Sequence, residues 1–350
     1  MLLTIIAFFV VLFVLVMVHE WGHFFAAKKM GMTVEEFGFG FPPRIASLKK
    51  NGTRYSFNWL PLGGFVKIQG ENGDDERAGS FGTKSAPARL LVLAAGVIMN
   101  IVLAWVLLSV SLGLGTPQPA SQNGQNDSVA IGEVLAGSPA EAAGFKKGDV
   151  VLRIDGQPVT SFKAFQEYTN QHAGQEVTYT IRRNGASLDL KAVPRQNPPV
   201  SEGAIGVQLA LPKVSYPWHI AFGKGAVLTW DYFKLTFDGF GQIIGQLFGG
   251  PKVAGEVAGP IGIAVLTGKF AKAGLAMLLQ FTALLSINLA IINALPIPAL
   301  DGGRILFVIV EAIRGKKVRA KVEQWSHAIG FALLLALMVV VTIKDIVKLF

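Results

Sequence analysis

Residues 1–29 have the sequence MLLTIIAFFVVLFVLVMVHEWGHFFAAKK, an apolar run that leads into the tract His19-Glu20-Trp21-Gly22-His23. The run is long enough for a helix that crosses a bilayer, which needs roughly 20 mostly apolar residues. A secretory signal peptide is the alternative, but it would have a basic start and a small-residue cleavage site, and this run shows neither. We therefore expect a retained transmembrane helix that carries ionisable residues near its end.

Composition extends this prediction to the whole chain. Of its 350 residues, 51% are hydrophobic and only 16% are charged, which is too apolar for an ordinary soluble enzyme. Three further stretches without charged residues are long enough to span a bilayer: 90–115, 273–300 and 325–343. The sequence predicts a multi-pass α-helical membrane protein with about four transmembrane helices.

Basic residues set the expected orientation. Lysine and arginine gather in the short loops at 28–29, 84–89 and 304–321. Cytoplasmic loops carry such an excess, so we expect both termini and residues 116–272 to lie outside the cytoplasm. The same bias explains the formal net charge of +9. Because no nucleic-acid motif accompanies that charge, we expect the lipid bilayer as a partner and no nucleic acid.

Two regions between the spans have other patterns. Residues 28–89 are rich in glycine and alternate polar with apolar residues, as at 54–59 and 64–68, which predicts a small membrane-associated β structure at the cytoplasmic face. Residues 215–250 mix aromatic residues with scattered charges, which is typical of amphipathic helices in the outer membrane interface.

A soluble domain is expected after a Gly, Gln, Asn and Ser-rich linker at 113–128. Short strand patterns follow, and the stretch 137–151 resembles a PDZ domain, a likeness that covers about residues 129–195. We expect an inserted α+β PDZ-like domain. It either binds an extended peptide as an added strand or acts as a spacer or size filter over the membrane site.

These regions give four expected segments. They are an N-terminal membrane core at 1–115, the linker and PDZ-like domain at 116–200, an interfacial segment at 201–272 and a C-terminal membrane core at 273–350.

The tract at 19–23 fits the pattern H-E-x-x-H. On a helix, positions i and i+4 project two imidazoles from one face toward one metal, and the intervening Glu20 reaches its bound water. The alternative is a pair of satisfied core histidines. The chain has no cysteine, so any metal must be held by His, Asp or Glu.

Catalytic zinc takes three protein ligands and leaves one position open, so a third ligand is needed. Asp301 is the candidate, because it directly follows the third span and by the expected orientation lies at the same membrane face as His23. Two prolines before it break the helix and two glycines after it allow close backbone approach. Alternatively, Asp301 caps a helix that starts at Gly302. We treat His172, His219 and His327 as non-ligands, because none lies at the expected depth of His19.

These features together resemble the site-2 protease family of intramembrane zinc metalloproteases, in the bacterial branch typified by the regulator-of-sigma-E protease. The resemblance covers nearly the whole chain. It includes a likeness of Gly38-Phe39-Gly40 to the family's membrane-reentrant β-loop, the tract Gly259-Pro260-Ile261-Gly262-Ile263, and Asn288 ahead of Asp301. One departure is that the type protein has two tandem PDZ domains, whereas residues 116–272 contain only one recognisable PDZ sequence.

The resemblance implies a zinc-dependent endopeptidase of the bacterial inner membrane, with its active site near the cytoplasmic face. It would cleave single-pass membrane proteins in regulated intramembrane proteolysis, for example anti-sigma factors or signal-peptide remnants. Substrate handling is then expected at Asn288, Pro296, Pro298 and a strand edge at 38–40, although Asn288 could instead join two helices. The rival interpretations are a membrane-anchored PDZ adaptor with a non-catalytic metal site and a metal-ion transporter.

Overall fold

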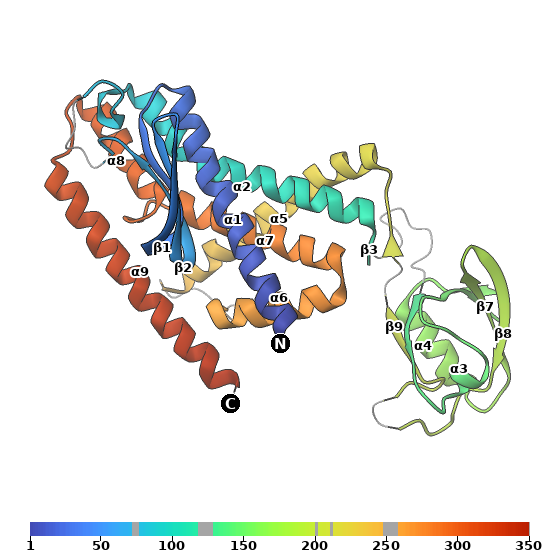
Figure 1. Cartoon of the computed structure of the whole chain (residues 1–350). Helices are drawn as coiled ribbons and strands as arrows, with labels where there is room; N and C mark the ends of the chain where they lie inside the picture. The colour runs from blue at the N-terminus through green and yellow to red at the C-terminus, as the bar shows by residue number, and fades with distance from the viewer. Residues whose placement is uncertain (72–76, 118–128, 200–201, 211–212, 248–257, 350) are drawn as a thin grey trace. The chain divides into compact units, whose positions relative to one another are not determined.

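The computed structural model describes all residues except 72–76, 118–128, 200–201, 211–212, 248–257 and 350. Much of the expected linker, residues 118–128, therefore lies outside the described part of the chain. The chain forms two compact units (Figure 1). Unit 1 consists of Met1–Ser111 and Trp218–Phe350, and unit 2 consists of Leu112–Pro217.

Unit 1 confirms the four predicted spans. Four helices are long and apolar enough to cross a membrane: α1 (Leu2–Lys29), α2 (Ala86–Leu114), α7 (Leu275–Ala294) and α9 (Ala320–Leu349). The third span is shorter than expected. It ends at Ala294 because Leu295 stands before Pro296 and has the extended φ of −64° and ψ of 141°, which a following proline favours over the helical region.

The described part of unit 1 has three further α-helices, α5 (Trp218–Leu247), α6 (Pro260–Ala273) and α8 (Asp301–Arg314), and a short 3-10 helix, η1 (Phe81–Thr83). Helix α5 packs its residues Leu228 and Phe233 against Ala104 of α2 and Ala283 of α7. The aromatic segment expected in the membrane interface thus forms one helix that packs against the spans α2 and α7.

The β region is a sheet made by β1 (Val34–Lys50) and β2 (Thr53–Ile68). The first half of β1 is its central strand, because Gly38 pairs with Ser56 on one side and with Phe65 on the other. The sheet runs beside α1 (Figure 1), with Phe37 against Phe24 and Phe39 against Phe13. Eleven helical residues separate those α1 contacts, so the sheet follows the helix for about 16 Å. It therefore extends along the apolar helix and is not confined to one end of it.

Unit 2 is an α+β unit around one antiparallel sheet of six strands, in the order β8-β7-β5-β4-β9 with β6 paired to β5. Its helices α3 (Pro139–Ala142) and α4 (Phe162–Gln171) begin after Ser138 and Ser161, whose side chains accept hydrogen bonds from the first turns. The strands are β4 (Val129–Val134), β5 (Val150–Ile154), β6 (Gln157–Pro158), β7 (Val177–Arg183), β8 (Ala186–Ala192) and β9 (Val207–Ala210), and β3 (Thr116–Pro117) pairs separately with β10 (Lys213–Val214). The edge strand β9 continues the unit past residue 200, where the sequence analysis ended the domain.

Candidate metal centre

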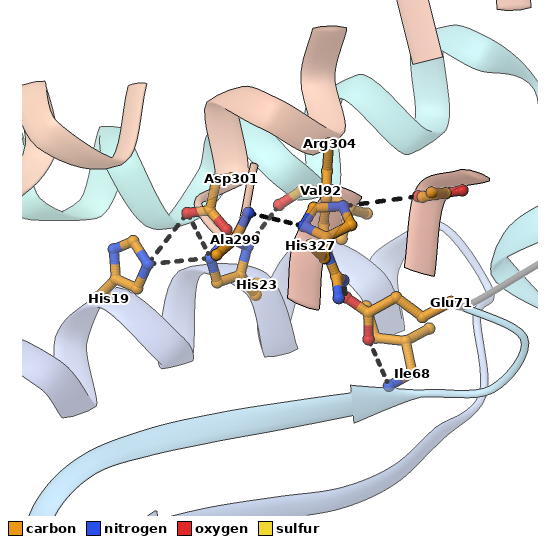
Figure 2. A network of polar contacts seen from close by, with 10 residues as sticks. His19, His23, Ile68, Glu71, Val92, Ala299, Asp301, Arg304 and His327 are labelled. Carbon is orange, nitrogen blue, oxygen red and sulfur yellow. Dashed lines mark hydrogen bonds and ion pairs between the residues drawn. The ribbon is translucent and has the colours of Figure 1, made fainter. Parts of the chain in front are cut away.

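Three side chains that the sequence singled out meet at one point of unit 1 (Figure 2). His19 and His23 lie one turn apart on α1, and their Nε2 atoms are 3.2 Å from each other. Oδ2 of Asp301, the first residue of α8, lies 3.1 Å from Nε2 of His19 and 3.2 Å from Nε2 of His23. The fold thus joins the first helix to a residue near the end of the chain.

The spacing of these atoms fits a zinc ion. Tetrahedral ligands at zinc bond lengths of roughly 2.0–2.1 Å lie about 3.3 Å from one another, close to the observed separations. Oδ2 of Asp301 is buried and has no hydrogen-bond donor. An ionised carboxylate facing two ring nitrogens could therefore hold a cation.

Contacts behind the imidazoles direct their free nitrogens to that point. Nδ1 of His23 lies 2.8 Å from the carbonyl oxygen of Val92 and can only donate to it, which leaves the Nε2 lone pair free. Nδ1 of His19 lies 3.1 Å from the side-chain amide nitrogen of Asn100, and Oδ1 of Asn100 is buried without a hydrogen-bond partner among the described residues. If the amide is flipped, Oδ1 accepts from Nδ1 of His19, which fixes the same tautomer as in His23. Asn100 is fully buried, and its backbone carbonyl accepts a hydrogen bond of 2.7 Å from Ser286.

Glycines allow the ligand-bearing segments to approach. A Cβ at Gly22 of α1 would lie 2.5 Å from the carbonyl oxygen of Ala95, and one at Gly96 of α2 would overlap the rings of His23 and His19. On α8, a Cβ at Gly302 would overlap the carbonyl oxygens of Leu295 and Ala294. These positions accept no side chain without displacing a ligand or its loop.

Asp301 does not cap a helix. Helix α8 begins at Asp301 itself, and its N-cap position is Leu300, which provides no side-chain hydrogen bond. The capping alternative is therefore wrong, and the carboxylate points to the imidazoles (Figure 2).

A cavity of about 250 Å³ opens beside these groups, and Glu20, Gly64 and Asn293 are among its lining residues. The amide nitrogen of Asn293 is 3.5 Å from Nε2 of His19. Neither Asn293 nor Asn100 was predicted from the sequence to lie at this site. Asn293 is the first residue of the proline-containing tract before Asp301, and this proximity could have predicted its position at the site. Asn100 stands in an apolar span, where no local motif distinguishes it.

The residues expected to bind substrate are not among those that line the cavity. Asn288 is half-buried on α7, Pro296 is exposed and Pro298 is half-buried, and none of the three is among the residues described as lining the cavity. The expectation of a free strand edge at 38–40 is wrong, because Phe39, like Gly38, has partners on both sides, Phe57 and Gly64. Residues 64–68 form an outer strand of this sheet, and Gly64 reaches the cavity.

Two imidazoles and a carboxylate around one buried point, with a second carboxylate in the adjoining cavity, define a membrane-embedded metallohydrolase. The model of Peptidase family M50 matches residues 7–337, and the chain belongs to this family, the site-2 protease family of intramembrane zinc proteases. It is thus a multi-pass membrane protease that cleaves membrane proteins within the bilayer.

Curated relatives that align along nearly their whole length are named zinc metalloproteases. The chain is 32% identical to the zinc metalloprotease RasP of Oceanobacillus iheyensis over 434 aligned positions, covering 99% of each protein. RasP of Shouchella clausii is 31% identical with 99% of each covered, and RasP of Geobacillus kaustophilus is 32% identical with 99% of this chain and 98% of the relative covered. These alignments exceed 350 positions, so the relatives carry residues that this chain lacks.

Proposed function

We propose that His19, His23 and Asp301 bind the zinc ion of this peptidase and that Glu20 is its general base. The observation that carries the proposal is the meeting of Nε2 of His19, Nε2 of His23 and Oδ2 of Asp301, which lie 3.1–3.2 Å from one another. With both imidazoles protonated on Nδ1, three lone pairs face the same point. Such an arrangement repels itself unless a cation is shared. Glu20 lines the adjoining cavity and is not needed as a ligand.

Zinc in this position supplies a Lewis acid that polarises the scissile carbonyl and lowers the pKa of a water toward 7. Glu20 accepts the proton of the attacking water and passes it to the leaving amine. The amide of Asn293 can donate to the oxyanion that develops on the substrate. Val92 and Asn100 hold the imidazoles in the tautomer that leaves Nε2 free.

A helical substrate must unwind locally, because its carbonyls are engaged in backbone hydrogen bonds. Among the described strands, the outer strand at 64–68 has a sheet partner on one side only, and Gly64 reaches the cavity beside Glu20, so the strand could take the unwound segment as an added strand. We assign Gly38, Phe39 and Gly40 to the support of that strand. Asn288, Pro296 and Pro298 would shape the segment's approach to the cavity. Anti-sigma factors and signal-peptide remnants are the substrates we expect.

The antiparallel sheet and two helices of unit 2 support the proposal of a PDZ-like domain, and its strand β9 lies at the sheet edge. We propose that this edge accepts a peptide, with a spacer or size-filter role as the alternative outcome. We place unit 2 and both termini outside the cytoplasm, on the inner membrane of a bacterium. Labelling of single cysteines introduced into this cysteine-free chain tests that orientation.

The deciding experiment measures zinc content and cleavage together. Purified Glu20→Gln should keep one zinc per chain and lose cleavage of a single-pass model substrate in liposomes. Asp301→Asn should lose both. Phenanthroline should stop the wild type, and added zinc should restore it. Cleavage by Glu20→Gln would reject the base, and full zinc content in Asp301→Asn would remove that residue from the ligand set.

A further inference from the structure

The last span contacts the loop that presents Asp301 at two neighbouring positions of α9. Nδ1 of His327 accepts a hydrogen bond of 2.8 Å from the backbone N–H of Ala299 (Figure 2). One turn further, Gly330 packs so closely on Pro298 that a Cβ at position 330 would overlap its carbonyl oxygen. His327 therefore contacts the loop that carries Asp301, although it is not one of the three side chains that meet at the candidate metal centre.

The hydrogen bond from Ala299 falls on a strained residue. Ala299 has a φ of +82°, which a residue with a side chain adopts only at a cost in energy. It stands two positions before Asp301, so its conformation sets where the carboxylate begins. A strained backbone persists only where its surroundings hold it, and the imidazole of His327 is the partner of its N–H.

The surroundings of His327 fix which of its nitrogens accepts. Nδ1 faces an N–H donor, so the proton of the neutral ring is on Nε2. Nε2 is buried without a hydrogen-bond partner among the described residues, and the nearest carboxylate oxygen is Oε1 of Glu323 at 4.0 Å. The ring also packs near Phe307, with 5.8 Å between centroids. Its one described hydrogen bond is thus the bond to the loop.

The C-terminal part of α9 is hydrogen-bonded to the start of α6, which packs on the helix that carries His19 and His23. The carboxylate of Asp345 accepts hydrogen bonds from the backbone of Gly259 at 3.2 Å and Gly262 at 2.7 Å, at the start of α6. Helix α6 packs on α1, where a Cβ at Gly268 would overlap Thr4. Helix α9 therefore connects the helix of His19 and His23 with the loop of Asp301.

We propose that His327 is a positioning residue of the peptidase site: its Nδ1 holds Ala299 in the strained conformation that places Asp301 against the two imidazoles. This inference rests on the proposed role of Asp301 as a ligand. The last span then positions a proposed zinc ligand in addition to anchoring the chain in the membrane. Its effect on zinc passes through the loop and not through direct contact.

Isosteric substitutions test the acceptor. The side-chain oxygen of asparagine superposes on Nδ1 of histidine, and that of glutamine superposes on Nε2. We expect His327→Asn to release zinc to a chelator at the wild-type rate and His327→Gln and His327→Leu to release it about tenfold faster. Gln324→Leu, which replaces an exposed polar residue of the same helix, should behave as the wild type. Equal release by the asparagine and glutamine variants would overturn the proposal.

A second readout does not depend on zinc. With a single cysteine at Leu300 in the loop, we expect maleimide to label zinc-free His327→Gln several-fold faster than zinc-free His327→Asn or the parent protein. Equal labelling of all three would show that His327 does not hold the loop. If Asp301→Asn keeps its zinc while labelling still depends on position 327, the ligand assignment fails and the loop contact stands.

Discussion

Gly96 of α2 lies directly against His23 of α1, so closely that a methyl group at position 96 would overlap Nε2 of His23. The second span, α2, thus packs directly against the histidines of the candidate metal centre. Because protein interiors have no free space to absorb such an overlap, the ring of His23 can keep its place only while position 96 has no side chain.

Gly96→Ala should therefore lose zinc while the chain still inserts and folds. The methyl group displaces Nε2 of His23 from the point it shares with Asp301, and we expect at least a tenfold loss of zinc affinity. Zinc content after competition with a chelator measures this. Gly223→Ala on α5 is the control, because a Cβ there meets nothing within 4 Å. Normal zinc affinity in Gly96→Ala would contradict the described packing.

Asn100 should matter through its side-chain acceptor. Asn100→Leu leaves Nδ1 of His19 without a partner, so we expect zinc affinity to fall about 10–100-fold. Asn100→Asp keeps an acceptor and should retain the metal. The comparison of zinc dissociation constants for the two variants checks the idea, and equal constants would mean that the amide does not orient His19.

Gly64→Ala should separate catalysis from metal binding. A Cβ at position 64 would lie 2.8 Å from Cγ1 of Val16 and 3.1 Å from Cγ of Glu20, so it moves the proposed base and leaves the ligands untouched. A shift of about 1 Å in a catalytic group costs roughly 100-fold in rate. We expect full zinc content with strongly reduced cleavage. Gly82→Ala, whose Cβ would meet its nearest atom at 3.7 Å, should cleave normally.

Unit 2 should depend on one buried ion pair. Arg183 donates from Nε and Nη2, at 2.7 Å each, to the carboxylate of Asp149, whose side chain is 1% exposed. Arg183→Met would leave that buried carboxylate without its cation, with the backbone N–H of Lys146 as its remaining described donor, at a cost of about 3 kcal/mol.

Hydrogen exchange of the full chain should show faster exchange in β5 and β7 of Arg183→Met. Lys191→Met is the matched control, because its pair with Glu176 is exposed and contributes little. Unchanged exchange in Arg183→Met would show that the pair does not stabilise unit 2.

Local sequence features predicted the ligands and the spans. The spacing of His19 and His23 is a property of one helix, and the apolar runs of the spans follow from the bilayer's thickness alone. Asp301 was found because a zinc site needs a third ligand and the proline-containing tract ends a span there. These inferences needed no knowledge of tertiary contacts.

What the sequence could not reveal depends on residues far apart in the chain. The pairing of Gly38 on both sides is a matter of register, which a single strand pattern does not specify. Asn100 and His327 stand in apolar helices, and only the packing of α2 and α9 brings them to their partners. No sequence pattern distinguishes Gly96, because it matters only by having no side chain where the imidazole of His23 lies.

The order in which the ligands enter the chain has a consequence for synthesis. His19, Glu20 and His23 emerge from the ribosome first, and Asp301 follows only after unit 2 and helices α5 to α7 have been made. During insertion, the nascent chain therefore lacks the third proposed ligand, and its site is incomplete. With Asp301 as the third ligand, as proposed, proteolysis can begin only after the segment that carries Asp301 has packed against the first helix, so the fold would delay activity until then.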